Sequence, residues 1–161
     1  MFIKVLTEDQ IAMVASLARE IWTEHYIPII GKEQVEYMLG RFQSEAAITE
    51  QIRNGADYFL IREGDESTGY IGVETKGVEL FLSKIYVKSP KRGRGYGRKA
   101  VEFAKKLAQK RRLARIVLTV NRNNLGAIRA YEKLGFLKVG PVIQDIGNGF
   151  VMDDYKMEKI I

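Results

Sequence analysis

The sequence predicts an α/β domain with a mixed β-sheet, and three observations lead to this prediction. Stretches with a helical spacing of apolar residues alternate along the chain with short apolar runs that are typical of strands. The 161 residues, 46% of them hydrophobic, are enough to form a domain with a buried core. No repeat, low-complexity tract or linker divides the chain, so we expect a single domain over residues 1–161.

The first half of the chain predicts a strand followed by helices. Residues 2–6 form a short apolar run, and Thr7 begins a T-E-D-Q pattern in which threonine can cap a helix. Apolar residues at helical spacing continue to about His25, and we expect Pro28 and Gly31 to break this helix. The other elements expected in this half are helices over 35–42 and 44–54 and strands over 58–61 and 70–73.

The second half predicts a strand over 78–87, a glycine-rich loop and an amphipathic helix from about 97 to 112. In this helix the apolar residues recur at positions i, i+3, i+4, i+7 and i+8, which gives one buried face. Residues 116–120 form a short apolar run typical of a strand that is buried on both faces. The remaining elements expected are a helix over 124–134 and strands from 136 to 139 onward and over 151–157.

The composition excludes several classes of site. The chain has no cysteine, which excludes a disulfide scaffold, a thiolate metal site and a cysteine nucleophile. It has one histidine, His25, so a zinc site is disfavoured and no metal is expected. The N-terminus shows no signal-peptide pattern, and no apolar run approaches the ~20 residues that cross a bilayer. We therefore expect a soluble cytoplasmic protein that does not bind membranes.

The formal net charge of +6 comes from one segment of the chain. Residues 84–115 hold thirteen lysines and arginines and a single acidic residue, Glu102. Residues 1–83 hold seven basic and fourteen acidic residues, so their net charge is negative. This concentration indicates a polyanionic partner at residues 84–115, and both nucleic acid and a phosphate-rich cofactor fit it.

The glycine-rich loop lies within this basic segment, between a strand and a helix. Three alternating glycines allow backbone N–H groups to converge, and the helix N-terminus adds a partial positive charge. Arg92, Arg94 and Arg98 can donate bidentate hydrogen bonds to phosphate. The glycine spacing matches neither the P-loop pattern nor the dinucleotide pattern G-x-G-x-x-G. The loop is therefore a candidate anion site of another kind.

The segment Arg92-Gly93-Arg94-Gly95-Tyr96-Gly97 resembles the Arg/Gln-x-x-Gly-x-Gly/Ala signature of the GNAT superfamily of acetyl-CoA-dependent N-acetyltransferases. Upstream, residues 85–87 are similar to a segment of the family's central strand. Downstream, residues 121–136 resemble the family's N-x-x-A-x-x-x-Y-x-x-x-G-F stretch. The resemblance implies a central mixed sheet of about seven strands, helices on both of its faces and a pair of parallel strands that splay apart.

The resemblance also implies a site for acetyl-CoA as co-substrate, in a gap between the strands that end at Val87 and Val120. The pantetheine arm would pair with the backbone of Ile85, Tyr86 and Val87, and the diphosphate would bind the N–H groups from Gly93 to Arg98. The residues expected to contact the cofactor are Ile85, Tyr86, Val87, Arg92, Gly93, Arg94, Gly95, Tyr96, Gly97, Arg98, Asn124 and Tyr131.

By the same resemblance, a neutral amine attacks the thioester carbonyl directly, and a backbone N–H near Val87 stabilises the oxyanion. Tyr131 stands where the family's tyrosine gives a proton or hydrogen bond to the leaving thiolate. Its spacing alone is also that of a core aromatic residue. Many relatives carry a glutamate base where this chain has Leu82, so the base stays open between water relays to Glu74, Glu79 or His25.

The acceptor is expected to be a primary amine of a small molecule, polyamine-like or otherwise cationic, or of a peptide. The region that would bind it is aromatic and has acidic neighbours, which suits a cation through ion pairing and cation–π contact. Its aromatic residues are Trp22, His25, Tyr26, Tyr37 and Phe42. Trp22 and Phe42 lie on apolar helix faces and are expected in the core.

Two alternatives remain open. Residues 91–99 also resemble an Arg/Gly nucleic-acid segment in which Tyr96 could stack on a base, although such segments are usually repeated and disordered. A domain that binds coenzyme A without catalysis is the other alternative. Dimers are frequent among members of the GNAT superfamily, often through C-terminal strands, which makes a homodimer an expectation here as well.

Overall fold

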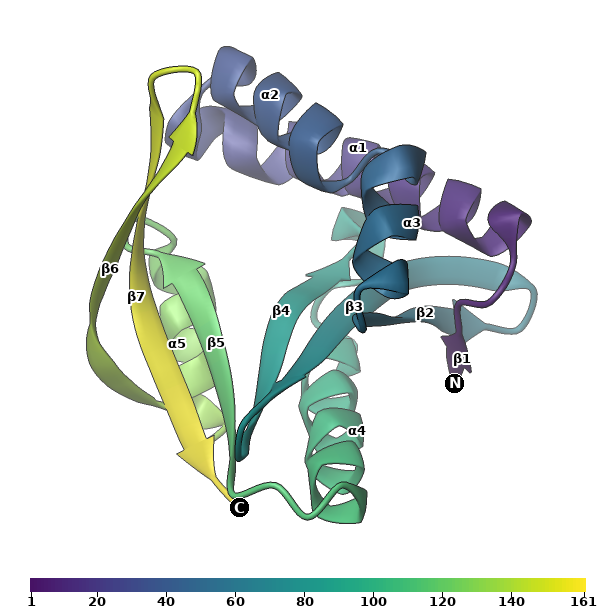
Figure 1. The fold of residues 1–161 in the computed structure, drawn as a ribbon, viewed down its shortest axis with the longest axis vertical. Coiled ribbons are helices and arrows are strands. Elements are labelled where there is room, and N and C mark those ends of the chain that lie inside the picture. Colours follow the sequence, from purple (N-terminus) through teal and green to yellow (C-terminus); the bar gives the residue numbers. More distant parts are fainter. The chain divides into compact units, whose positions relative to one another are not determined.

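The computed structural model describes residues 1–161 as seven strands, five α-helices and one short 3-10 turn (Figure 1). In chain order these are β1 (Phe2–Lys4), α1 (Glu8–Ile30), α2 (Lys32–Phe42), α3 (Glu45–Arg53), β2 (Asp57–Glu63), β3 (Glu66–Lys76), β4 (Glu79–Val87), η1 (Ser89–Lys91), α4 (Tyr96–Lys110), β5 (Arg115–Asn121), α5 (Leu125–Lys133), β6 (Leu137–Gly147) and β7 (Phe150–Ile160). Each helix and strand expected from the sequence is present in the expected order, with ends that differ by a few residues.

The strands form one seven-stranded sheet in the order β1-β2-β3-β4-β5-β7-β6. The pairs β1–β2, β2–β3, β5–β7 and β6–β7 are antiparallel. β4 and β5 are parallel, and their ladder joins residues 79–81 of β4 to residues 115–117 of β5. Two parallel neighbours need a crossover connection, which α4 supplies. The predicted mixed sheet of about seven strands, with one parallel pair, is confirmed.

Contacts between residues divide the chain into two compact units, each made of two segments. The first unit comprises Met1–Glu74 and Lys84–Ala100, and the second comprises Thr75–Ser83 and Val101–Ile161. The first unit therefore holds the three N-terminal helices, the end of β4 and the glycine-rich loop. The second unit holds the start of β4, most of α4 and all elements from β5 onward.

α1 begins with the capping arrangement expected at Thr7. The Thr7 hydroxyl accepts a hydrogen bond from the Gln10 backbone N–H (3.2 Å), and the Gln10 side chain accepts one from the Thr7 N–H (3.0 Å). One face of the helix is buried in the first unit, and its residues are Val14, Leu17, Ala18, Ile21 and Trp22. Neither α1 nor any shorter helix has the length and apolar character that a membrane crossing requires.

α1 continues through Pro28 to Ile30, so the expectation that Pro28 breaks this helix is wrong. Proline has no N–H to donate to the carbonyl four residues earlier, which normally interrupts a helix. Here the loss falls in the last turn, where the Gly31 N–H still bonds the Ile27 carbonyl at 2.9 Å. Gly31 then ends the helix with φ 87°, as expected for a glycine at this position.

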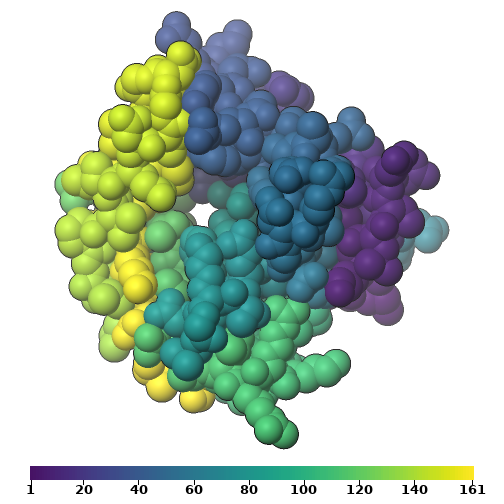
Figure 2. Space-filling view, viewed as in Figure 1, coloured from purple at the N-terminus to yellow at the C-terminus, as the bar shows by residue number.

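A buried polar network ties the helices of the first unit to its strands. Gln43, which is 2% exposed, donates to the Tyr58 hydroxyl (3.0 Å) and accepts from the Tyr70 hydroxyl (2.6 Å). The Tyr58 hydroxyl donates to Gln51 of α3 (2.5 Å), so each buried hydroxyl is paired. Burial raises the pKa of both tyrosines. In Figure 2 the side chains of α2 and α3, in blue, lie beside each other on the visible surface.

In the second unit, β5 is buried as its apolar composition predicts. Ile116, Val117 and Leu118 are all buried, and β5 is flanked on one side by β7. The Lys159 ammonium on β7 donates to the Leu134 carbonyl at the C-terminal end of α5 (2.5 Å). A cation at this end also interacts favourably with the helix dipole. This bond joins α5 to one face of the β5–β7 pair.

Gly69 of β3 lies against the end of β4, where a side chain has no room. A Cβ on Gly69 would collide with the Tyr86 carbonyl oxygen and would lie 3.0 Å from the Val87 Cα. Both neighbours are backbone atoms, so they cannot move aside by changing a rotamer. The close approach at Gly69 therefore helps to position the end of β4 from which the glycine-rich loop starts.

Replacing Gly69 by alanine is expected to lower the free energy of unfolding by about 1–3 kcal/mol, because the added methyl group overpacks the β3–β4 contact. Urea denaturation measures this change. Gly40→Ala is the matched control, since its Cβ would meet nothing within 4 Å, and it should be neutral or stabilise α2 by up to about 1 kcal/mol. A Gly69→Ala variant as stable as the wild type would contradict the role of this contact.

Candidate phosphate-binding site

The segment from β4 to α4 is fixed at its start by backbone and side-chain bonds within the first unit. The Lys88 N–H donates to the Thr68 carbonyl (2.8 Å), and the Arg92 N–H donates to the Ser89 carbonyl (3.2 Å). The Arg92 guanidinium Nε also donates to the Val87 carbonyl (3.1 Å). The loop therefore leaves the strand in a defined direction, although it is exposed to solvent.

From Gly93 to Arg98, the backbone N–H groups make no hydrogen bond within the chain. The first internal bond of α4 runs from the Lys99 N–H to the Gly95 carbonyl (3.0 Å), so the N–H groups of the first turn are free. Gly93 and Gly95 have φ values of 80° and 82°, which turn the backbone between these donors. Free amides at a helix N-terminus are a site for an anion.

Gly97, the second residue of α4, has open space around it. Its φ is not in the left-handed region, and a Cβ built on it meets no atom within 4 Å. Neither backbone strain nor packing within the chain therefore requires glycine here. A group bound at the N–H donors would need the space that a side chain at Gly97 would fill.

The cations of the loop are partly engaged by acidic residues of the β2–β3 turn. The Lys91 ammonium lies 3.1 Å from a Glu66 carboxylate oxygen and 3.4 Å from one of Glu63. The Arg94 guanidinium is more distant, at 4.0 Å from Glu63. Arg92, Arg94 and Arg98 are exposed. The arginines are therefore better placed than Lys91 to meet an incoming anion.

Tyr96, the first residue of α4, is held by Glu63. Its hydroxyl donates to the Glu63 carboxylate at 2.5 Å, and Tyr96 is only 9% exposed. This bond is the largest cause of a lowered pKa at Glu63, followed by the Lys91 charge, and it raises the pKa of Tyr96. The ring is therefore not available for stacking on a base, which removes the main support for the nucleic-acid alternative.

Glu63 is a site residue that the sequence analysis missed. The sequence pattern predicts strands over 58–61 and 70–73 and assigns no role to the residues between them. Two carboxylates in this turn, in a chain whose basic segment follows the next strand, were the available signal. These carboxylates reach the loop because the β2–β3 hairpin brings them beside it. The sequence pattern did not show which residues of the hairpin lie beside which residues of the loop.

The end of β4 lies in an aromatic cluster of the first unit. The Tyr86 ring has its centroid 5.4 Å from that of Trp22 and 5.5 Å from that of Tyr70. Tyr26 completes the cluster, with its hydroxyl 3.5 Å from the Tyr86 hydroxyl. Trp22 is 3% exposed, so its predicted place in the core is confirmed, and its indole N–H has no hydrogen-bond partner. Ile85, Tyr86 and Val87 are half-buried.

Two other aromatic residues of the expected acceptor region are covered by a cation of their own helix. The Arg41 guanidinium lies 5.4 Å from the centroid of the Phe42 ring and donates to the Tyr37 hydroxyl (3.2 Å). Phe42 is half-buried rather than fully in the core. An acceptor cation would therefore have to displace Arg41 to use the Phe42 ring.

The predicted residues Asn124 and Tyr131 lie in the second unit, on and beside α5. The Asn124 side chain caps the helix by accepting from the Ala127 N–H (3.4 Å) and is 7% exposed. Tyr131 is half-buried, with its ring centroid 5.7 Å from that of Phe136 in an edge-on contact. Both residues therefore belong to an ordered part of the chain, Asn124 as the N-cap of α5 and Tyr131 within the helix.

Two residues of β4 bear on the open question of the base. Leu82, at the position where relatives were expected to carry glutamate, is buried and apolar. The Glu79 carboxylate lies 2.8 Å from Nη2 and 3.0 Å from Nε of Arg115, so it is held in an ion pair. Clusters of three or more histidine, cysteine, aspartate or glutamate side chains that could hold a metal are absent.

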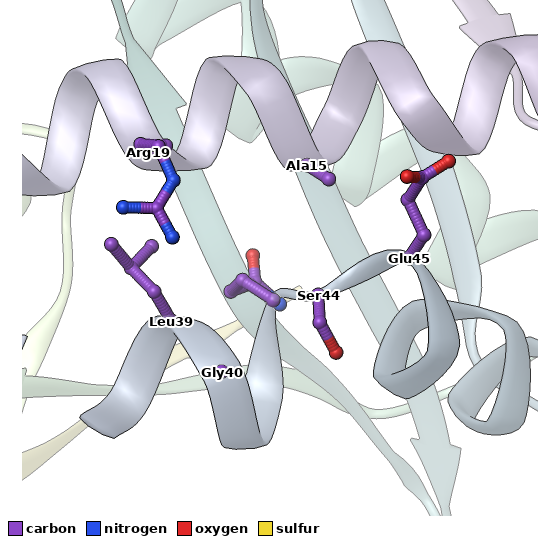
Figure 3. A pocket seen from close by; sticks show the side chains of 7 residues that line it. Ala15, Arg19, Leu39, Gly40, Ser44 and Glu45 are labelled. Atoms are coloured by element: carbon purple, nitrogen blue, oxygen red, sulfur yellow. The ribbon is translucent and has the colours of Figure 1, made fainter. Parts of the chain in front are cut away.

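A separate hollow of about 220 Å³ lies between α1 and the α2–α3 corner. Figure 3 shows its lining, to which α1 contributes Ala15 and Arg19 and the corner contributes Leu39, Gly40, Gln43, Ser44 and Glu45. The Arg19 guanidinium is paired with Glu36 at 3.3 Å. None of the predicted site residues lines this hollow.

The sequence and the fold were compared with known proteins. A family model described as the acetyltransferase (GNAT) family matches residues 15–136. Among solved structures, PaiA N-acetyltransferase from Thermoplasma acidophilum in complex with coenzyme A has 20% identity and a TM-score of 0.82, over 100% of this chain and 99% of that one.

Two further structures show the same fold in proteins with different named substrates. The ribosomal-protein-S18-alanine N-acetyltransferase from Escherichia coli has 19% identity and a TM-score of 0.73, over 100% of this chain and 94% of that one. A spermidine N-acetyltransferase chimera from Vibrio cholerae and hSSAT has 17% identity and a TM-score of 0.68, over 99% of this chain and 95% of that one. At these identities the likeness establishes the fold and not the substrate.

The contact between Tyr96 and Glu63 leads to a prediction for Tyr96→Phe. Removing the hydroxyl deletes the largest cause of the low Glu63 pKa, so this pKa should rise toward its ordinary value, as measured by carboxyl NMR titration. A carboxylate with a lowered pKa stabilises the fold above its unfolded pKa, about 4.3, and loses this effect as the pH falls through the folded value. The wild type should therefore have a higher free energy of unfolding than Tyr96→Phe. This difference should be largest at neutral pH and shrink below about pH 4.

Tyr37→Phe provides the control for this titration, because its hydroxyl contacts Arg41 and not Glu63. It should leave the Glu63 titration unchanged. An unaltered Glu63 pKa in Tyr96→Phe would mean that the hydroxyl does not hold this carboxylate.

Proposed function

The chain belongs to the GNAT acetyltransferase family, and on this premise we propose that it transfers the acetyl group of acetyl-CoA to a primary amine. The single observation that carries this proposal is the row of free N–H groups from Gly93 to Arg98 at the start of α4. In this proposal they bind the diphosphate of the cofactor. Acetyl-CoA, when bound, supplies the activated thioester.

The residues present fit such a cofactor. Gly93, Gly95 and Gly97 leave the space in front of the donors open, since a Cβ on any of them meets nothing within 4 Å. Arg92 and Arg98 add exposed positive charge beside the donors. The pantetheine arm would run along the backbone of residues 85–87, next to the loop in the chain, and Asn124 would contact the same arm.

In the proposed reaction, the chain orients the amine and handles protons. The lone pair of a neutral amine attacks the thioester carbonyl carbon, and a backbone N–H near Val87 stabilises the oxyanion. Tyr131 donates a proton or hydrogen bond to the departing sulfur. The ordered position of Tyr131 on α5, against Phe136, supports a fixed direction for its hydroxyl.

We propose that the acceptor is a cationic amine, of the polyamine-like class or a peptide amine. The aromatic cluster around Tyr86 lies at the end of β4, where the acetyl group would be presented, and Glu20 of α1 lies 3.6 Å from Lys88 just beyond it. Aromatic faces and carboxylates favour a cation. Relatives that share the fold are named for spermidine and for a ribosomal protein, so the fold is compatible with both classes.

The exposed edge of the sheet supports the expected homodimer. β6 is the last strand of the sheet, and its residues Leu137, Val139 and Ile143 are 72%, 53% and 68% exposed. An open edge strand with apolar side chains favours pairing with another strand. A second copy of the chain is the proposed occupant.

Gly97→Val is expected to keep the fold but to weaken acetyl-CoA binding at least tenfold, because its side chain would occupy the space in front of the free amides. Isothermal titration with acetyl-CoA measures the affinity, and thermal unfolding measures the fold. Gly40→Val is the control, since its Cβ would also meet open space but lies on α2. Unchanged affinity in Gly97→Val would place the diphosphate elsewhere.

Tyr131→Phe is expected to lower kcat by about 100-fold with little change in acetyl-CoA affinity, because a general acid typically contributes a factor of this size or more. The assay follows coenzyme A release with spermidine, an aminoglycoside, free amino acids and a short peptide as acceptors. An undiminished rate would remove the proton-donor role. Acetyl-CoA binding without turnover on any amine would instead favour the silent coenzyme A binder.

A further inference from the structure

The hollow between α1 and the α2–α3 corner lies apart from the residues of the proposed acetyl transfer. Its volume of about 220 Å³ is below the ~300 Å³ at which pockets for drug-sized ligands begin, so it suits a smaller molecule. All of its lining residues lie between positions 15 and 45, within the first unit. A ligand bound here would therefore not contact the segment from β4 to α4.

Arg19 of α1 supplies a cation at one end of the hollow. Its guanidinium is engaged through Nη1 alone, which donates to both carboxylate oxygens of Glu36 at 3.3 Å. Nε and Nη2 have no partner within the chain, so this side of the guanidinium keeps two donors. Glu36 does not line the hollow. Arg19 can therefore hold a carboxylate of a ligand in the two-donor geometry that arginine favours.

Glu45, the first residue of α3, supplies a carboxylate at the other end. It is exposed, and its carboxylate makes no ion pair and no hydrogen bond within the chain. In Figure 3 the Glu45 carboxylate extends toward α1, whereas the Arg19 guanidinium extends from α1 toward α2. The position in the first turn of α3 is favourable for a negative charge. It also leaves the carboxylate oxygens able to accept hydrogen bonds from an ammonium group.

An apolar part of the hollow separates these two charges. Ala15 lies one turn before Arg19 on α1, about 6 Å along the helix axis, and Figure 3 shows it between Arg19 and Glu45. Leu39 and Gly40 contribute the α2 side of the lining. A Cβ on Gly40 would meet nothing within 4 Å, so the space beside it is open. The hollow thus combines opposite charges at its ends with an apolar middle.

The other polar groups of the lining are already engaged within the chain. The Gln43 side chain is bonded to two buried tyrosine hydroxyls. The Ser44 hydroxyl accepts from the Ala47 N–H (3.1 Å) as the N-cap of α3. Selection among charged ligands therefore falls to Arg19 and Glu45.

We propose that this hollow binds a small ω-amino acid, a zwitterion in which several methylene groups separate the ammonium from the carboxylate. The Arg19 guanidinium holds the carboxylate, Glu45 holds the ammonium, and Ala15 and Leu39 cover the methylene groups. A ligand with only a positive charge would meet Arg19, and one with only a negative charge would meet Glu45, so both are disfavoured. An α-amino acid is disfavoured because its two charged groups are attached to one carbon atom.

The probe is 6-aminohexanoate, and isothermal titration with the full chain measures its affinity. Glu45→Gln and Arg19→Gln should each weaken binding by about tenfold or more, because each removes a charged hydrogen-bond partner. Glu50→Gln and Arg53→Gln are the matched controls, since these two residues of α3 pair with each other (2.9 Å) and do not line the hollow. Gly40→Leu should abolish binding by filling the hollow, with thermal unfolding as the measure of its fold.

Hexylamine, hexanoate and alanine lack one charge or the separation between the charges, so each should bind about tenfold or more weakly than the probe. Absence of saturable probe binding to the wild type at millimolar concentration would overturn the proposal. Binding that Gly40→Leu and Glu45→Gln leave unchanged would also overturn it, because the probe is a primary amine and would then occupy another site. Acetyl transfer is assayed separately, so a failure of the proposed function leaves this result intact.

Discussion

The unpaired N–H groups at the start of α4 are the constraint that the surrounding structure must satisfy. The segment that carries these amides contains two glycines with left-handed backbone, Gly93 and Gly95, and it is fixed by bonds to other parts of the chain. The chain anchors it at Lys88 through β3, at Arg92 through the Val87 carbonyl, and at Tyr96 through Glu63. The Gly69 contact sets the end of β4 from which these anchors start. The segment between β4 and α4 is thus held in place by the rest of the first unit.

The acidic turn between β2 and β3 changes how the basic segment should be understood. Sequence counting gives residues 84–115 a large excess of positive charge, but Lys88, Lys91 and Arg115 are engaged by Glu20, by Glu63 and Glu66, and by Glu79. These pairs are partly exposed, so each adds little to stability. They neutralise these three cations, whereas Arg92 and Arg98 remain exposed and outside these ion pairs.

Local patterns allowed most of the fold to be predicted. Capping at Thr7, the apolar spacing of α4 and the short apolar run of β5 depend on neighbours in sequence, and each prediction is confirmed. Pro28 was misjudged because the penalty of a proline depends on how many turns follow it. The hydrogen bond between Glu63 and Tyr96 depends on elements brought together from distant parts of the chain. A sequence pattern without strand register does not contain that information.

The division of β4 and α4 between the two units affects how the protein can be made. The chain leaves the first unit at residue 75, returns to it at residue 84 and leaves it again at residue 101. Neither unit is therefore one continuous stretch of the polypeptide. The first unit has all its residues once synthesis reaches residue 100, whereas the second unit still needs residues up to 161. The first unit is therefore complete during synthesis before the second.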